Sequence, residues 1–269
     1  MEGTKEDIVL KYVMLSNMRG IGAVTQNILL DKAEGIRELF SFDEEKDHSL
    51  KASLEIKLGR ARLSLFLAQR NDKTIENTAK DIIKAAREEG MDIVVREDIN
   101  FPKRLKDMRD MPILLYTKGE LSINNNKESV GIVGARRCSG YGKLEAIKIA
   151  AAAVSDGSAV ISGMAKGIDS YAHTSALKEE GYTIAVLGNG ADICYPKEHE
   201  KLYETIIKKG CILTEYPPGT SPRQYNFPRR NRIIAGLSDR LYVIDANRKS
   251  GTGSTVDYAK KYEREVTKL

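Results

Sequence analysis

The stretch from residue 129 to residue 155 constrains the fold of this chain most strongly. It begins with the continuous apolar run 129–133, which is typical of a strand buried on both faces. The glycine-rich turn Gly134-Ala-Arg-Arg-Cys-Ser-Gly-Tyr-Gly142 follows, and then an alanine-rich helix former. In open α/β sheets, anions bind where strands end and helices begin, because free N–H groups and the helix dipole favour negative charge there. The turn is therefore the first candidate for a binding site.

The same strand-and-helix period continues to the end of the chain and indicates an α/β fold with a doubly wound parallel sheet. The predicted strands cover 129–133, 159–161, 183–187, 211–213 and 241–244, and the predicted helices cover 143–155, 169–180, 197–209, 229–237 and 254–264. Two more strands are predicted at 92–96 and 113–117.

Residues 6–86 have helical spacing of apolar groups, with predicted helices over 7–15, 25–30, 35–42, 55–69 and 73–89. We expect a small helical domain over 1–88 and an α/β domain over 89–269, with its core at 129–269. Gly20-Ile21-Gly22 resembles a helix–hairpin–helix turn, in which backbone N–H groups approach a DNA phosphate. A plain glycine cap between packed helices explains the same residues.

Composition limits the possible classes of protein. The 269 residues are 41% hydrophobic and 30% charged, as in globular proteins, and the apolar runs are too short to cross a membrane. Met1 is followed by Glu2, Lys5 and Glu6, which is unlike a signal peptide, so we expect a cytoplasmic protein without membrane contact. The three cysteines form no CxxC pair, which indicates reduced thiols and no structural zinc.

Basic residues recur in every loop at the expected ligand-binding edge of the sheet. They are Arg136, Arg137 and Lys143 in the first loop, Lys166 in the second, Lys197 in the third, Arg223, Arg229, Arg230 and Arg232 in the fourth, and Arg248 and Lys249 in the fifth. A mononucleotide needs one or two cations, whereas a row of them across five loops suits an extended polyanion. For any single one of these residues, the alternative to a DNA contact is a charge that is solvated or paired within the protein. For Arg229 and Arg232, burial together with pairing is an open alternative.

Aromatic residues lie among these cations, namely Tyr141, Tyr195, Tyr225 and Phe227. Unstacked bases rest on such rings, at about 1–3 kcal/mol per base, which favours single strands over duplex. For Phe227, a role as a core anchor is equally consistent with the sequence.

Cofactor and catalytic signals are weak. The first turn does not match GxGxxG, and no carboxylate follows the second predicted strand to hold a ribose, so we expect no nicotinamide cofactor. Asp169 and His173 lie four residues apart, and we expect a local hydrogen bond between them rather than a metal or acid–base site. We predict no catalytic residue and no metal ligand. Cys138 is interpreted as a bystander.

Several motifs together resemble the DprA/Smf family of bacterial DNA-processing proteins. They are 131–136, 162–169 with Ala172-His173, 183–188 with Tyr195-Pro196, 215–219, 227–238, and Ser250-Gly251 with Thr255, and the likeness extends to Phe101-Pro102 and Pro112. The chain departs from the family at Asp245, where glutamate is usual, at Gly253-Ser254, and at 265–269, where the family pattern continues through a further strand and a Val-Pro-Gly turn.

The resemblance implies an extended Rossmann-like domain with a helical N-terminal domain, binding of single-stranded DNA, homodimer formation, and interaction with the RecA recombinase. It implies that the protein protects incoming DNA and helps to load RecA in transformation or recombination, with no established catalysis. In this family the DNA site uses Arg136, Lys197 and the segment that contains Arg223, Gln224, Phe227 and Arg232. The full candidate DNA site is Gly134, Arg136, Arg137, Lys166, Lys197, Arg223, Gln224, Phe227, Arg229, Arg232, Ser250 and Gly251.

Two alternatives remain open at this point. One is a nucleotide-binding or nucleoside-monophosphate-processing enzyme related to the phosphoribohydrolases, since Ser250-Gly-Thr-Gly-Ser-Thr-Val-Asp257 loosely resembles their phosphate loop but lacks its double glycine and glutamate. The other is a scaffold whose helical N-terminal part recruits a protein partner.

Overall fold

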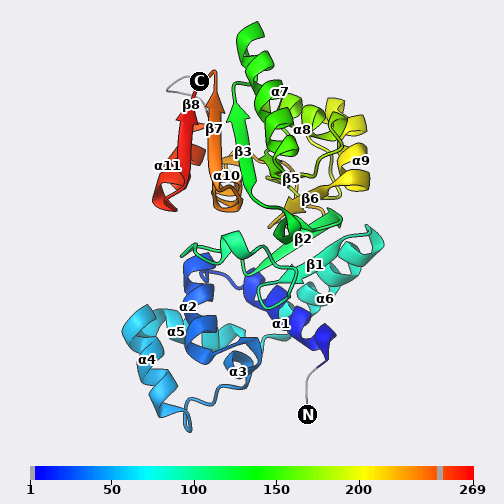
Figure 1. Cartoon of the computed structure of the whole chain (residues 1–269). Helices are drawn as coiled ribbons and strands as arrows, with labels where there is room; N and C mark the ends of the chain where they lie inside the picture. Colours follow the sequence, from blue (N-terminus) through cyan, green and yellow to red (C-terminus); the bar gives the residue numbers. More distant parts are fainter. Residues whose placement is uncertain (1–3, 247–250) are drawn as a thin grey trace.

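The computed structural model describes residues 4–246 and 251–269 (Figure 1). It places an eight-stranded sheet and its covering helices above a group of six helices formed by the N-terminal part of the chain. The strands are β1 (Asp92–Val95), β2 (Leu114–Gly119), β3 (Ser129–Gly134), β4 (Ala159–Ser162), β5 (Thr183–Leu187), β6 (Cys211–Thr214), β7 (Arg240–Ile244) and β8 (Glu265–Lys268). Their order in the sheet is β1-β2-β6-β5-β4-β3-β7-β8.

Six of these strands, β3 to β8, run parallel, which confirms the predicted parallel sheet. β1 and β2 extend it as an antiparallel pair, with β2 bonded to β6. Each strand predicted from the sequence is present within two residues of its expected bounds. β8 was not predicted, because its sequence Glu-Val-Thr-Lys has too few apolar residues to be distinguished from a terminal loop.

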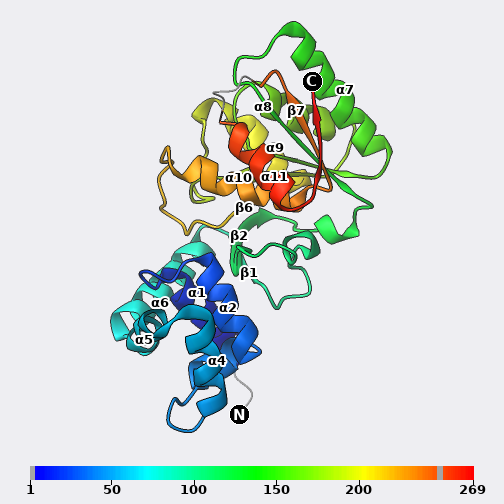
Figure 2. The same ribbon diagram turned by 90° about the vertical axis from the view of Figure 1, so that its left-hand side faces the viewer.

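Helices cover both faces of the parallel strands, as a doubly wound sheet requires. They are α7 (Gly140–Ser155), α8 (Ile168–Lys178), α9 (Glu200–Lys209), α10 (Asn226–Leu237) and α11 (Gly253–Lys261), and a short 3-10 helix, η3 (Lys197–His199), precedes α9. Val130 and Ile132 of β3 pack with α7 and α8, whereas Val133 points to the opposite face with α10 and α11. Figure 2 shows α10 and α11 in front of the sheet.

The N-terminal helices are α1 (Lys5–Asn17), α2 (Ala23–Ala33), α3 (Ile36–Ser41), α4 (His48–Leu58), α5 (Arg60–Gln69) and α6 (Lys73–Glu88). Thr4 caps α1 and Asp72 caps α6 through their side-chain oxygens. The single helix predicted over 55–69 is wrong, because Gly59 has φ of 80° and separates α4 from α5.

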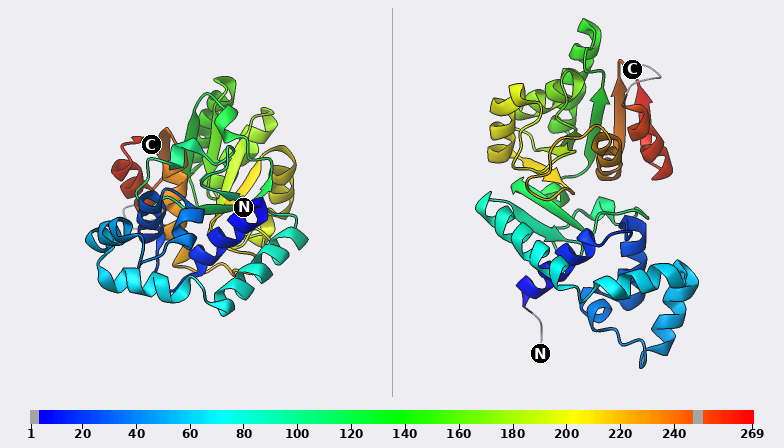
Figure 3. Two further views of the ribbon diagram at one scale, coloured as in Figure 1. Left: turned by 90° about the horizontal axis from the view of Figure 1, so that it is seen from below. Right: turned by 180° about the vertical axis from the view of Figure 1, so that it is seen from behind.

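The helical part is joined to the sheet by one continuous apolar core. Leu15 and Leu29 of the helices share that core with Leu114 and Tyr116 of β2. The side chain of Asn27 also donates a hydrogen bond of 2.7 Å to the carbonyl of Met111, just before β2. Views from below and from behind show the helices gathered against the β1–β2 edge (Figure 3). The contacts that hold α2 against the sheet are therefore made by residues from both parts of the chain.

Candidate functional site

A cavity of about 800 Å³ opens at the carboxyl ends of the parallel strands. Gly134 and Arg136 after β3, Asp169 of α8 and Asp245 after β7 line it together with residues of α10 and Gly251. β4 lies on one side of β3 and β7 on the other, so the cavity lies where the direction of strand addition reverses. Ligands of doubly wound folds bind at this point because the loops of the two neighbouring strands diverge there.

The turn after β3 is held by close backbone packing. A side chain at Gly134 would collide with the carbonyl oxygen of Ile244 and the side chain of Ile168, so only glycine fits. Ser139 caps α7 by accepting a hydrogen bond of 2.9 Å from the N–H of Gly142, and Asp245 accepts bonds from the N–H and hydroxyl of Ser139 at 2.7 and 2.8 Å. These contacts present Arg136 and Arg137 to solvent, and neither forms an ion pair within 4–246 or 251–269.

Arg230 of α10 forms part of the cavity lining behind Arg136. Its side chain is buried and donates hydrogen bonds to the carbonyl oxygens of Gly163, at 2.9 Å, and of Val186. Burial lowers the pKa of Arg230 to about 10, Asp169 opposes this change, and the positive charge of Arg136 adds to it. Two arginines of like charge thus face one cavity, where an anion would relieve their repulsion.

The sequence did not identify Arg230 as a site residue. The run Arg229-Arg230-Asn231-Arg232 was treated as one group, although its members lie on different faces of a helix. Phe227, Arg230 and Ile234 are spaced by three and four residues, so they lie on one face of α10. This face lines the cavity at the carboxyl ends of the strands, which we call the first cavity.

The buried acid and histidine behind the cavity have structural partners. Asp169 accepts hydrogen bonds from the N–H groups of Gly163 and Ala165 at 3.1 and 3.2 Å, and burial raises its pKa against the opposing charge of Arg230. His173 bonds through Nδ1 to the hydroxyl of Thr183 at 2.7 Å. Burial lowers the pKa of His173 to about 3, so the ring is neutral. The expected hydrogen bond between Asp169 and His173 is wrong, because each side chain is committed to the loop or strand beside it.

An aromatic pair forms the rim of the cavity. The rings of Tyr195 and Phe227 lie 5.6 Å apart between centroids, and the guanidinium of Arg230 lies 5.8 Å from the Phe227 centroid. Phe227 is half-buried, and a side chain at Gly188 would reach within 2.9 Å of its ring. Tyr195 is 43% exposed, which leaves a free ring face at the entrance. A base could stack there, since stacking needs only an accessible π face.

The remaining candidate cations do not line this cavity. Lys197 is exposed at the start of η3, and Lys166 forms an ion pair with the exposed Glu198. Arg223 donates a hydrogen bond of 2.9 Å to the hydroxyl of Tyr225. Gln224 does line the cavity, as do Gly134, Arg136, Phe227 and Gly251. Ser250, Arg248 and Lys249 lie outside the described residues.

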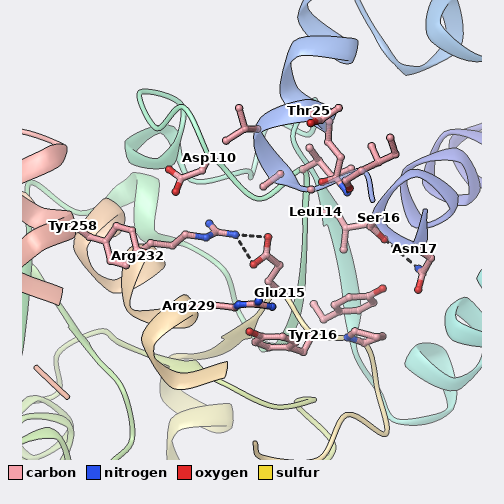
Figure 4. A pocket seen from close by; sticks show the side chains of 18 residues that line it. Ser16, Asn17, Thr25, Asp110, Leu114, Glu215, Tyr216, Arg229, Arg232 and Tyr258 are labelled. Atoms are coloured by element: carbon pink, nitrogen blue, oxygen red, sulfur yellow. Dashed lines mark hydrogen bonds and ion pairs between the residues drawn. The ribbon is translucent and has the colours of Figure 1, made fainter. Parts of the chain in front are cut away.

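Arg229 and Arg232 lie on the other side of α10, in a second cavity of about 540 Å³ (Figure 4). The structure therefore places Arg232 in a different cavity from Arg136. Nη2 of Arg232 lies 2.5 Å from both carboxylate oxygens of Glu215, and the arginine is 7% exposed. Burial alone would lower the pKa of Arg232. The negative charges of Glu215 and Asp110 raise it by more than burial lowers it, so the pKa lies above its usual value.

The first cavity contains the groups that a binding site for a nucleic acid needs. Asp169 and Asp245, the carboxylates that line it, both accept hydrogen bonds from neighbouring loops. Across 4–246 and 251–269, no group of three or more His, Cys, Asp or Glu is arranged to hold a metal ion. No helix of the described chain is long and apolar enough to span a membrane. A buried cation, an exposed cation and two rings can hold a ligand that carries both phosphate and base.

Comparison with known proteins agrees with this geometry. Residues 92–269 match the family model of DNA recombination-mediator protein A. The chain is 43% identical to protein Smf of Synechocystis over 176 residues, which are 64% of this chain and 44% of that protein. It is 35% identical to DNA processing protein DprA of Bacillus subtilis over 185 residues, or 69% of this chain and 62% of that protein. The chain thus spans about half the length of the relatives it matches.

Two solved structures have the same fold. DNA processing protein A of Streptococcus pneumoniae superimposes with a TM-score of 0.76 at 28% identity, covering 100% of this chain and 87% of that one. The Helicobacter pylori protein, whose structure concerns its mode of binding single-stranded DNA, has a TM-score of 0.61 at 31% identity and covers 67% of this chain and 82% of that one. The family match, which extends over more than half of the chain, establishes that this protein belongs to the DNA recombination-mediator protein A family, as its DprA/Smf-like motifs indicated.

Proposed function

We propose that this protein binds single-stranded DNA in the cavity at the carboxyl ends of the strands. The observation that carries the proposal is the meeting of the exposed Arg136 and the buried Arg230 with the rings of Tyr195 and Phe227 in one cavity. Phosphate and base are thereby recognised side by side. Single strands are favoured because a base must leave its stack to lie on a ring.

The DNA path includes the candidate residues beyond the cavity. Arg137, Lys166, Lys197 and Arg223 are exposed, and each is adjacent in sequence to a lining residue or lies within two residues of one, so they would extend the binding surface along a strand. Lys166 would exchange Glu198 for a phosphate, at little cost because both partners are more than half exposed. Gly251, which lines the cavity, belongs to the same proposed path.

In the cell, we propose that this DNA binding protects incoming single strands and helps to load the RecA recombinase during transformation or recombination. The protein would act in the cytoplasm as a homodimer, without catalysis. The similarity to the Helicobacter pylori protein, whose structure concerns its mode of binding single-stranded DNA, supports the first step of this proposal.

The test is a titration of a labelled dT oligomer, and of a duplex of the same length, at two salt concentrations. For single strands, the logarithm of affinity falls with the logarithm of salt by about 0.7 per neutralised phosphate. Replacing Arg136 and Lys197 by alanine removes two such contacts. We expect the slope to become shallower by about 1.4 and the affinity at 0.1 M salt to fall about 25-fold.

A matched variant removes the same two charges from a distant surface. Lys148 and Lys178 are exposed on α7 and at the end of α8, and changing both to alanine should leave the slope unchanged. Equal binding by the wild type and the Arg136→Ala/Lys197→Ala protein would refute the site. An equal loss of affinity in both double variants would show that the effect depends on net charge alone and not on a specific site.

A further inference from the structure

The second cavity lies between the N-terminal helices and the sheet domain (Figure 4). Its lining comes from the end of α1, the start of α2, the entrance to β2, the segment 215–217 and one side of α10. It lies on the opposite side of α10 from the cavity of the proposed function, and the two sets of lining residues have no member in common. Neither part of the chain could form it alone.

The first turn of α2 points free backbone donors at this cavity. The first hydrogen bond of the helix runs from the N–H of Gln26 to the carbonyl of Gly22, at 2.9 Å. The N–H groups of Ala23, Val24 and Thr25 therefore have no partner within the helix. Gly22, the N-cap, has no side chain to satisfy them, and all three residues line the cavity. Such a helix start attracts an anion through its N–H groups and its dipole.

A buried arginine supplies the second, independent indication. Arg232 uses Nη2 to hold Glu215, but its Nη1 is buried without a hydrogen-bond partner in the part of the chain that the structure describes. Figure 4 shows its guanidinium extending toward the cavity between Asp110 and Glu215. A buried charged donor without an acceptor is costly, and an anionic oxygen in the cavity would satisfy it.

The acids of the cavity do not cancel this attraction. Glu215 is already committed to Arg232. Asp110 accepts a hydrogen bond of 2.7 Å from the hydroxyl of Tyr262 and lies 3.4 Å from Nζ of Lys261. Arg229, by contrast, forms no ion pair within the described ranges and lies 5.7 Å from the centroid of the Tyr225 ring. The guanidinium of Arg229 and the start of α2 are left as unbalanced positive charge.

Aromatic side chains complete the lining. Tyr216 and Tyr258 contribute rings, and the hydroxyl of Tyr116 is buried with no partner among the described residues. A volume of about 540 Å³ lies within the usual range for small-ligand sites. The cavity thus combines donors for a phosphate with rings for a base.

We propose that this second cavity binds a 5′-nucleotide, with its phosphate at the start of α2 and beside Arg229 and Arg232, and its base against the tyrosines. The nucleotide is either free or the 5′-terminal nucleotide of a DNA strand. In the second case the proposal rests on the proposed function, because the rest of that strand would occupy the first cavity. A bound nucleotide would bridge α2 and α10 and so join the helical part to the sheet domain.

The test uses the amide NMR signals of residues 23–25 in the full chain. Deoxyadenosine monophosphate should shift these signals saturably, whereas deoxyadenosine, which lacks the phosphate, should not. Ala23→Glu places a carboxylate at the first position of α2, which suits the helix but repels an anion. We expect it to weaken binding about tenfold, whereas the uncharged Ala23→Gln stays within about twofold of wild type.

Further arms separate the two sources of the phosphate. If only a 5′-phosphorylated dT oligomer shifts these amides, and the unphosphorylated oligomer does not, the ligand is a strand end. If neither the mononucleotide nor the phosphorylated oligomer shifts them, the proposal is overturned. It is equally overturned if Ala23→Gln weakens binding as much as Ala23→Glu does. Failure of the proposed function is distinct, since it would appear in the Arg136 and Lys197 variants and in signals of residues 134–136.

Discussion

The electrostatic interaction between Arg230 and Asp169, which both line the first cavity, allows a quantitative test of how this site is stabilised. Arg230 joins α10 to the ends of two strands, since it donates to the carbonyls of Gly163 and Val186. Asp169 accepts from the amides of Gly163 and Ala165 on the same loop. Both side chains are buried, so each provides the main countercharge of the other.

Replacing Arg230 by methionine keeps much of the side-chain volume but removes the charge and the donors. Two hydrogen bonds from a charged group contribute about 1.5–3 kcal/mol each, and Asp169 is left buried and unpaired. Regained apolar packing offsets part of this loss, so we expect the free energy of unfolding at pH 7 to fall by about 3–5 kcal/mol. Urea denaturation followed by circular dichroism measures it.

The pH dependence and a double-mutant cycle test the cause. Without Arg230, the pKa of Asp169 rises further above its unfolded value, so the folded state holds a proton that the unfolded state has lost. Stability of the Arg230→Met protein should therefore fall as the pH rises from 4 to 7. Adding Asp169→Asn removes that ionisation and should restore about 1–3 kcal/mol. A coupling energy near zero, or an Arg230→Met loss below about 1 kcal/mol, would refute this account.

Two further predictions concern residues around the same cavity. His173 has its pKa lowered by burial to about 3, below its unfolded value, so its contribution to stability is complete above pH 6.5 and is lost as the pH falls toward 3. Between pH 7 and pH 5 this amounts to about 2 kcal/mol, and His173→Gln should remove that part of the acid sensitivity in denaturation curves; an unchanged pH profile would contradict it. Gly188→Ala places a methyl group 2.9 Å from the ring of Phe227, and we expect a loss of about 1–3 kcal/mol in thermal unfolding, partly recovered by Phe227→Leu. If Phe227→Leu recovers no stability, the ring of Phe227 is not the reason why a side chain at position 188 is destabilising.

Local patterns predicted the parallel part of the sheet well. A strand buried on both faces is mostly apolar, and the helices between such strands carry an apolar face. The order of elements from residue 129 can therefore be predicted from the sequence. Strand identity at 183–187 follows from the apolar run 184–187. Weakly apolar edges such as β8 lack this signal, and the break at Gly59 depends on one backbone angle.

The sequence by itself determined which chemical groups surround the ligand-binding edge, because the carboxyl ends of parallel strands converge there. It could not assign those groups to separate cavities. That assignment depends on the phase of α10, which turns Phe227 and Arg230 to one side and Arg229 and Arg232 to the other.

Only the tertiary structure brought the start of α2 next to Arg232, since these residues are distant in the chain and meet through the packing of Asn27 and the β2 strand. The glycine turn at 134–142 was readable as an anion site from local residues alone. The second cavity was not, because its donors come from two parts of the chain that share no local pattern.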